Sequence, residues 1–364
     1  MRKTVTLRDV ANAASVSKTT ASNVFSRPER VRPALRERVE AAAKHLGYEG
    51  PDPKGRLLSS GKVNAIGVVP PAAFGITLFL KSNYARDFLA GVASVCEERD
   101  VGVSLVSGRD DQQAWGIRSA VVDGFIVNNV EQAGALEAAK GRQLPFVVAG
   151  PDAPPGVSSV RIEDGDGIRQ VVRHLLDLGH RLFAIATPLR ELRAPIFHPP
   201  AKKSRRLVAP MTGIASRIAA IKEVLAEAGI RFSSVPILEA CITPDEIAAF
   251  GNAAATLLER APEATAIIAT TDTVALGILA EAHRRGISVP GDLSITGFDD
   301  MPEAARADPP LTTVAQSPVD IGRIAARLLL DGGPPQHIVL PVKLIVRQST
   351  APPRHSGRPL TRRK

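Results

Sequence analysis

The stretch Thr6–Asn23, TLRDVANAASVSKTTASN, decides how the N-terminal part of this chain folds. Thr6 stands three residues before Asp9, a spacing typical of the capping box that starts a helix. The apolar residues that follow recur at helical spacing and predict about two turns. Ser17 comes after a break in this pattern and can cap a second helix, which we expect to run to about Phe25. The stretch therefore predicts two short helices joined by a turn.

The second predicted helix has an apolar side and a polar side. Ala21, Val24 and Phe25 would be buried, whereas the opposite side carries short donors and acceptors with one cation. Such a surface can enter the major groove of DNA and meet base edges and phosphates. The alternative is a helical hairpin whose polar side is only solvated. The candidate DNA-contacting residues in this stretch are Thr6, Ser17, Lys18, Thr19, Thr20, Ser22 and Asn23.

A third helix completes the N-terminal unit. Pro33 stands at a typical helix start and Gly47 at a typical helix stop. An apolar stripe at helical spacing lies between them. We therefore predict a three-helix domain over residues 1–49.

From residue 63 onward the chain alternates short apolar runs with helical stretches. The runs are AIGVV, GVSLV, GFIV and PFVVA in a first series, and LFAIA, TAIIA and LSITGF in a second. Short buried strands separated by helices indicate a parallel sheet covered on both faces. Two such series predict two doubly wound α/β lobes, and a cleft at the carboxyl ends of their strands is the natural ligand pocket.

Several longer motifs accompany these two patterns. They are VDGFIV at 122–127, HLLDLGHR at 174–181, TTDTVALG at 270–277, VPGDLSITGFDD at 289–300, PPLTTVAQ at 309–316 and VRQST at 346–350. With the three-helix unit they make nearly the whole chain resemble the lactose repressor/galactose repressor (LacI/GalR) family of bacterial transcription regulators.

The resemblance implies an all-α helix-turn-helix DNA-binding domain followed by an α/β core like that of periplasmic sugar-binding proteins, with two doubly wound parallel-sheet lobes. The core would bind a small effector and form a homodimer on double-stranded operator DNA. The implied domains are the DNA-binding domain at 1–49, a hinge at 50–62, an N-lobe at 63–161 and 316–334, a C-lobe at 162–315 and 335–350, and a basic disordered tail at 351–364.

The hinge is a second place where the family contacts DNA. Arg56 and Leu58 match the family's arginine and the leucine that enters the minor groove, counting back from residues 59–61. Pro53 and Gly55 lower the helix propensity of this segment. Two alternatives therefore stay open: Leu57 could be the inserted residue, or the segment could be a plain flexible linker.

The effector site is expected between the lobes. Asp299 follows a strand and a glycine, and the family uses this aspartate to accept hydroxyl hydrogen bonds; Arg217 matches its effector-contacting arginine. Each has a structural alternative, a turn cap for Asp299 and a solvated helix charge for Arg217. The other residues singled out are Thr271 and Asp272, of which Asp272 could be only an N-cap, and Phe298, a stacking wall or a core residue. Gly150 replaces an aspartate common in the family, which leaves the ligand class open between sugars and related metabolites.

Charge and composition restrict the function classes. Residues 1–62 hold 13 Lys or Arg against 6 Asp or Glu, so a polyanion would bind at this end. Two distant cysteines, no apolar run of signal-peptide length and no membrane-length run predict a cytoplasmic, nucleoid-associated protein without disulfides or membrane spans. We expect no metal and no cofactor, because no metal-ligand spacing, phosphate loop or nucleophile elbow is present.

The prediction is a DNA-binding transcriptional regulator, and specifically a repressor, rather than an enzyme. The alternative is a solute-binding protein without a transcriptional role, which the core alone would allow. The segment 189–211, which contains the basic run 202–206, has little periodicity and is expected to be a mobile surface loop.

Overall fold

The computed structural model forms two compact units. One is the N-terminal unit, which reaches to residue 64 and includes residues 121–123; the other contains the rest of the chain. Among the described helices, none is long and apolar enough to cross a membrane. The structure describes residues 5–26, 28–50, 61–71, 75–108, 114–128, 133–151, 153–189, 194–201, 207, 212–241 and 246–353.

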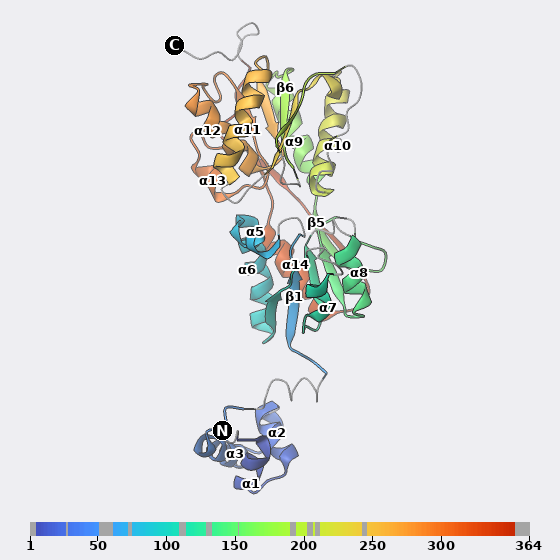
Figure 1. The fold of residues 1–364 in the computed structure, drawn as a ribbon, viewed down its shortest axis with the longest axis vertical. Coiled ribbons are helices and arrows are strands. Elements are labelled where there is room, and N and C mark those ends of the chain that lie inside the picture. The colour runs from blue at the N-terminus through green and yellow to red at the C-terminus, as the bar shows by residue number, and fades with distance from the viewer. Residues whose placement is uncertain are drawn as a thin grey trace. The chain divides into compact units, whose positions relative to one another are not determined.

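The N-terminal unit contains α1 (Leu7–Ala13), α2 (Lys18–Ser26), the short η1 (Pro28–Arg30) and α3 (Pro33–Leu46) (Figure 1). Local signals set the ends of these helices. Thr6 and Asp9 form the predicted capping box at α1. The Ser17 hydroxyl accepts the Thr20 N–H at 3.0 Å at the start of α2. Gly47 ends α3 with a φ of 68°, in the left-handed region that glycine adopts without a side-chain clash.

A small apolar core joins the three helices. Phe25 and Tyr48 meet edge to face against it, with ring centroids 5.6 Å apart. Because α2 turns its apolar residues into this core, its polar side faces outward, as the sequence predicts. The buried members are Val10, Ala11, Ala14, Ala21, Val24, Val39 and Ala43.

The first large sheet of the second unit has six parallel strands in the order β12-β5-β4-β3-β1-β2. Its strands are β1 (Ala65–Val69), β2 (Gly102–Leu105), β3 (Phe125–Asn128), β4 (Phe146–Ala149), β5 (Ser159–Ile162) and β12 (His337–Leu340). The helices of this lobe are α5 (Gly75–Lys81), α6 (Asn83–Glu98), α7 (Trp115–Ser119), α8 (Ala133–Gly141) and α14 (Pro318–Asp331) (Figure 1).

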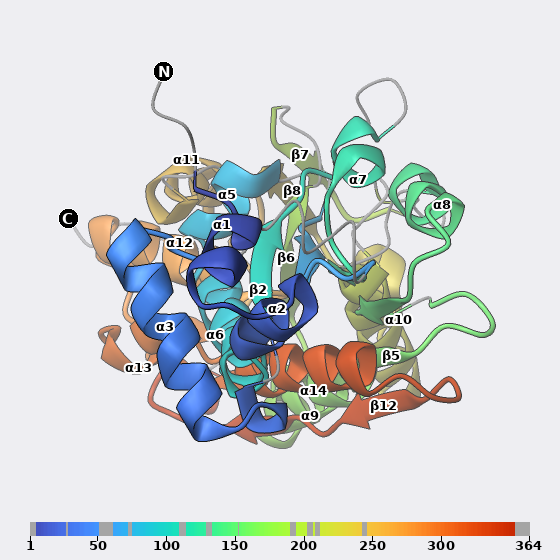
Figure 2. The same cartoon turned by 90° about the horizontal axis from the view of Figure 1, so that it is seen from below.

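Helices α6 and α14 cross in close contact beside this sheet (Figure 2). Gly91 and Gly322 lie at the crossing. A Cβ on Gly91 would lie 2.0 Å from the Val319 carbonyl oxygen, and one on Gly322 would lie 2.1 Å from the Phe88 carbonyl oxygen. The two backbones therefore approach so closely that only glycine fits at these positions.

The second large sheet has the order β10-β9-β6-β8-β7, and all its strands are parallel except β7. Its strands are β6 (Phe183–Leu189), β7 (Ile196–His198), β8 (Ile237–Cys241), β9 (Ala266–Ala269) and β10 (Ser294–Thr296). The helical elements of this lobe are α9 (Asp164–Asp177), α10 (Thr212–Glu227), η2 (Phe232–Ser234), α11 (Glu246–Arg260), α12 (Asp272–Arg284) and α13 (Pro302–Arg306).

The expectation of a loop throughout 189–211 is wrong for part of that segment. Ile196–His198 forms β7, an antiparallel edge strand beside β8. His198 Nε2 lies 2.6 Å from Oε1 of the buried Glu239, and the Arg260 guanidinium lies 4.5 Å from the centroid of the Phe197 ring. These long-range contacts order a strand too short to show a period in the sequence. The basic run 202–206 lies outside the described residues.

The chain passes between the two lobes three times. The first passage joins β5 to the second sheet, and the other two are β11 (Thr313–Ala315) and β13 (Lys343–Ile345), which pair antiparallel. The assignment of 335–350 to the C-lobe is wrong at its start, because β12 pairs in parallel with β5 at the edge of the first sheet. From β13 onward the chain contacts the second lobe, where the Leu344 N–H donates to Gln170 Oε1 at 3.1 Å and the Ser349 carbonyl accepts from the Ile295 N–H.

Candidate functional site

The outward side of α2 is the candidate DNA-reading surface of the N-terminal unit. Lys18 and Thr19 are exposed, while Ser22 and Asn23 are half-buried. Thr20 is held by Ser17, whose hydroxyl lies 2.8 Å from that of Thr20.

Thr6 and Ser17 both serve as helix caps, so their first role is local. Thr6 Oγ1 also donates to Asp9 Oδ2 at 2.7 Å, and both residues are exposed. Capping fixes the two helix starts and thereby the orientation of the polar side of α2. Arg56 and Leu58, together with the question of a hinge helix, lie outside the described residues.

A cavity of about 680 Å³ lies between the two large sheets of the second unit. Its walls come from the carboxyl ends of β3, β4, β5, β9 and β10 and from the first turns of α6, α9, α10 and α12. This is the predicted place for a ligand in an α/β fold of two lobes. The cavity is therefore the candidate effector site.

Arg217 forms the centre of one wall. Its Nε donates to Asp164 Oδ1 at 2.8 Å, and its Nη1 donates to the Thr270 carbonyl at 2.6 Å. The guanidinium also stacks on Phe298, with Cζ 3.5 Å from the ring centroid. Only 6 % of Arg217 is exposed, so these contacts hold the fork rigidly at the cavity surface.

Asp299 lies beside Arg217, with Nη1 and Oδ1 3.6 Å apart, and Gln316 Nε2 donates to the same oxygen at 2.6 Å. Burial raises its pKa to about 6, and the charge of Arg217 opposes the shift. The backbone is strained, because Asp299 and Asp300 have φ values of 124° and 55°. Arg347 Nη2 donates to Asp300 Oδ1 at 2.6 Å, so an ion pair holds this turn from outside.

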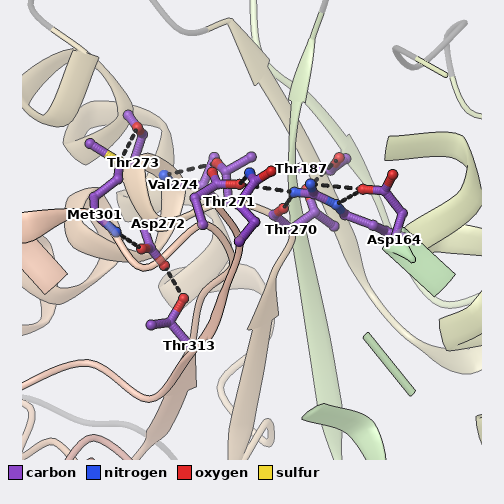
Figure 3. Close-up of polar contacts among 12 residues, drawn as sticks. Asp164, Thr187, Thr270, Thr271, Asp272, Thr273, Val274, Met301 and Thr313 are labelled. Atoms are coloured by element: carbon purple, nitrogen blue, oxygen red, sulfur yellow. Dashed lines mark hydrogen bonds and ion pairs between the residues drawn. The ribbon is translucent and has the colours of Figure 1, made fainter. Parts of the chain in front are cut away.

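Asp272 holds Met301, the residue that directly follows this turn (Figure 3). Its carboxyl group accepts from the Met301 N–H at 2.8 Å and lies 2.5 Å from the Thr313 hydroxyl, and the residue is fully buried. Burial, reinforced by the nearby Asp299 carboxylate, raises its pKa to about 7. Asp272 therefore connects the start of α12 to the Asp299 turn and to β11.

The first lobe contributes Asn128, at the carboxyl end of β3. Its side chain lines the cavity and is fully buried. The Tyr84 hydroxyl lies near enough to the amide to interact with it, yet among the described residues neither Nδ2 nor Oδ1 has a partner at hydrogen-bond geometry. Unpaired buried polar atoms are rare because each costs about 1–3 kcal/mol. The amide therefore offers one donor pair and one acceptor to a ligand.

Two further groups complete the first-lobe wall. Tyr84 stacks on Phe88, with ring centroids 6.0 Å apart, and burial raises the pKa of its hydroxyl to about 12. Asn83 Nδ2 donates to Glu303 Oε2 of the other lobe at 2.8 Å, which is a direct hydrogen bond across the cavity. Gly150 lines the same cavity and has no side chain, so Asn128 is a polar side chain of this wall and Gly150 is not.

The five effector residues expected from the sequence lie close together but not all at the surface of the cavity. Arg217, Thr271 and Asp299 line it, and Thr271 also caps α12 by accepting from the Val274 N–H. Asp272 and Phe298 lie behind this wall, both fully buried. Their contacts are with the protein, because the adjacent strand ends cover them.

Asn128, Asp164 and Gln316 also belong to the site, and the sequence did not predict them. Asn128 could have been found, because it directly follows the apolar run at 125–127 at a strand end. Asp164 offers a weaker signal, because it stands at a helix start but follows Glu163. Gln316 comes from a passage between lobes, and no local pattern places its amide against Asp299.

Comparison with known proteins agrees with this arrangement. The profile of bacterial regulatory proteins of the lacI family matches residues 6–50, and that of the periplasmic binding protein-like domain matches residues 172–350. An HTH-type transcriptional regulator of Mycobacterium tuberculosis is 37% identical over 97% of this chain and 98% of its own length. The chain belongs to the lacI family of bacterial regulatory proteins. It is a DNA-binding transcriptional regulator with a sugar-binding type of effector domain.

Solved structures of lacI-family proteins resemble this one over most of their length. A regulator from Enterococcus faecium with bound ribose is 26% identical, with a TM-score of 0.66 over 80% of this chain and all of its own. The lac repressor dimer bound to operator and an anti-inducer has a TM-score of 0.77 over 96% of this chain and all of its own; at 24% identity it supports the fold.

Proposed function

We propose that this lacI-family regulator is a repressor that binds a pseudo-palindromic operator as a homodimer and changes its operator affinity when a small molecule occupies the cavity between the lobes. The cavity carries this proposal. Its wall holds the rigid guanidinium of Arg217, the carboxylate of Asp299 in a strained turn and the buried amide of Asn128, which makes no hydrogen bond among the described residues. Groups fixed in this way around a space of ligand size are typical of a recognition site.

The DNA side of the proposal is supported by the polar side of α2. One short recognition helix reads too few base pairs for useful affinity, so pairing two copies on two half-sites doubles the footprint. Lys18, Thr19 and Asn23 are the residues we expect to meet base edges. The match to the lacI family over residues 6–50 disfavours the alternative of a solute-binding protein without a transcriptional role.

Two sets of contacts could couple the cavity to DNA affinity. The Asp299 turn is held by Gln316, just after β11, and through Asp300 by Arg347, just after β13. β11 and β13 connect the lobes. A ligand that changes the position of Asp299 would therefore also shift these two segments, and with them the orientation of one lobe relative to the other. A coupling of about 1–3 kcal/mol would suffice for a working switch.

The test is a fluorescence-anisotropy titration of full-length protein with operator DNA, which is first located by footprinting. It is repeated with each compound that raises the melting temperature in a screen of sugars, polyols and nucleosides. Asp299→Asn should keep operator affinity without ligand and lose the response to ligand. If no compound changes wild-type operator affinity, the core is only a dimerisation scaffold.

A further inference from the structure

The Asp123 carboxylate holds the backbone just before β1, where the chain coming from the DNA-binding helices enters the core. Its Oδ1 accepts from the Val63 N–H at 2.8 Å, and its Oδ2 accepts from the Asn64 N–H at 2.7 Å. Hydrogen bonds to an ionised carboxylate are about twice as strong as those between neutral groups. One side chain, 60 residues away from Val63 in the sequence, therefore fixes two consecutive peptide groups.

The backbone at this point has an unusual conformation that the carboxylate explains. Asn64 has a φ of 59°, in the left-handed region that few residues other than glycine adopt. A turn of this kind directs successive N–H groups to the same side of the chain, where they form a concave site for an anion. The Asp123 carboxylate occupies that site, so the conformation of the chain before β1 depends on it.

Asp123 itself is held firmly on both sides along the chain. Just before it, Arg142 Nη1 donates to three carbonyl groups of residues 117–120 at 3.0, 2.8 and 2.8 Å, which fixes the end of α7. Just after it, the Gly124 carbonyl accepts from the Gly67 N–H at 2.9 Å, which ties the start of β3 to β1. The carboxylate therefore extends from a rigid support and not from a free loop.

A fixed point here has a consequence for DNA binding. By their contacts residues 121–123 belong to the N-terminal unit, while Gly124 belongs to the core, so Asp123 stands at the boundary of the two units. The place and direction in which each chain leaves the core limit how far apart two DNA-binding domains of a dimer can reach. A dimer that holds these points firmly accepts one spacing of half-sites, and one that holds them loosely accepts several.

We propose that Asp123 is a positioning residue for operator recognition: by holding Val63 and Asn64 it fixes the exit of the chain from the core, and thereby sets the half-site spacing that the regulator accepts. The inference rests on the proposed function, because it assumes a homodimer on two half-sites. It goes further by naming a residue that acts on the geometry of DNA binding through the backbone of Val63 and Asn64.

The test measures the affinity of the full-length protein for operators of different spacing by fluorescence anisotropy. The operator located by footprinting is compared with versions that have one base pair added or removed between the half-sites, which turns one half-site by about 35° around the DNA axis. We expect the wild type to lose at least about tenfold in affinity on these altered operators. Asp123→Asn should lose about threefold or less, because its amide nitrogen cannot accept a hydrogen bond and one backbone N–H is released. Its affinity for unrelated DNA of the same length should be unchanged.

Asp100→Asn is the matched control. Asp100 stands two residues before β2, as Asp123 stands two residues before β3, and both strands are neighbours of β1. Asp100 is exposed, and its carboxylate makes no hydrogen bond or ion pair with any described residue. Its φ of 53° lies in a region that asparagine also adopts. The substitution removes the same charge, and we expect it to keep the spacing preference of the wild type.

Hydrogen exchange followed by mass spectrometry tests the same contact in the wild type without any substitution. The Val63 and Asn64 amides should exchange slowly in the wild type and fast in Asp123→Asn, and fast exchange in the wild type would overturn the proposal. An Asp123→Asn variant with the spacing preference of the wild type would also overturn it, and so would an Asp100→Asn variant that loses the preference equally. If the wild type binds no site with two half-sites, the proposed function itself fails. If it binds such a site as a dimer and Asp123→Asn behaves like the wild type, only this inference fails.

Discussion

Replacing Asn128 by leucine separates the cost of an unpaired amide from its use in binding. Leucine has the same branching at Cγ, is larger and has no polar atoms, and the amide it replaces makes no hydrogen bond of good geometry within the described residues. Each unsatisfied buried group costs about 1–3 kcal/mol, so Asn128→Leu should raise the free energy of unfolding by about 1–3 kcal/mol in the absence of ligand. The melting temperature should rise by a few degrees, at about 2–4 °C for each kcal/mol.

The same variant should bind the ligand more weakly. Two lost hydrogen bonds of about 0.5–1.5 kcal/mol each correspond to a loss of affinity of about five- to a hundredfold. Urea denaturation measures the stability, and calorimetry with the polyol found in the screen measures the affinity. A variant that gains stability while losing affinity is the expected signature, because most core substitutions lower stability.

Asn83→Leu is the matched control for this prediction. It removes an amide on the same wall that does have a partner, since Asn83 donates to Glu303. We expect it to lower the free energy of unfolding by about 0.5–1.5 kcal/mol. If Asn128→Leu is destabilised as much as Asn83→Leu, the Asn128 amide is already satisfied in the free protein. If Asn128→Leu binds the polyol as tightly as wild type, the amide takes no part in recognition.

Three further predictions concern other parts of the molecule. The pKa of Asp272 is raised to about 7 in the folded protein, so this carboxyl group makes the free energy of unfolding fall as the pH rises from about 4 to 7. Asp272→Asn should reduce the difference in the free energy of unfolding between pH 5 and pH 8, measured by urea denaturation. An unchanged difference would contradict the raised pKa of Asp272. Gly322→Ala should cost about 1–3 kcal/mol or more, because its Cβ meets the Phe88 carbonyl, whereas Gly141→Ala, with open space around it, should cost nothing in the same denaturation experiment. Lys18→Ala should change base preference in a binding-site selection, and an equal loss on every sequence would assign Lys18 to phosphate contact instead.

Much of the N-terminal unit could be predicted from sequence because its signals are local. A capping box, a serine cap and a C-terminal glycine act within four residues of the helix ends that they define, and the structure places Thr6, Ser17 and Gly47 as expected. The alternation of apolar runs and helical stretches also identified two parallel sheets correctly. The resemblance to the lacI family then extended these patterns to the function class.

The ligand site was only partly predictable, because its geometry depends on residues far apart in the chain. Sequence alone could choose Arg217 and Asp299 by their motifs, but only the tertiary structure showed that Asp164 neutralises the arginine and that Gln316 binds the aspartate. Similarly, Phe298 and Asp272 follow strand ends as ligand contacts do, yet neighbouring strands cover both.

What the sequence by itself determined is therefore the identity of the elements and of the family, since helix caps, apolar periods and contiguous motifs are properties of neighbouring residues. What only the tertiary structure decided is which polar groups remain without a partner. Asn128 becomes an unpaired amide only when β3 and its neighbours bury it, and β7 becomes a strand only when β8 offers its edge. Burial and hydrogen bonding between distant segments are set by the packing of the whole core, and no local pattern records them.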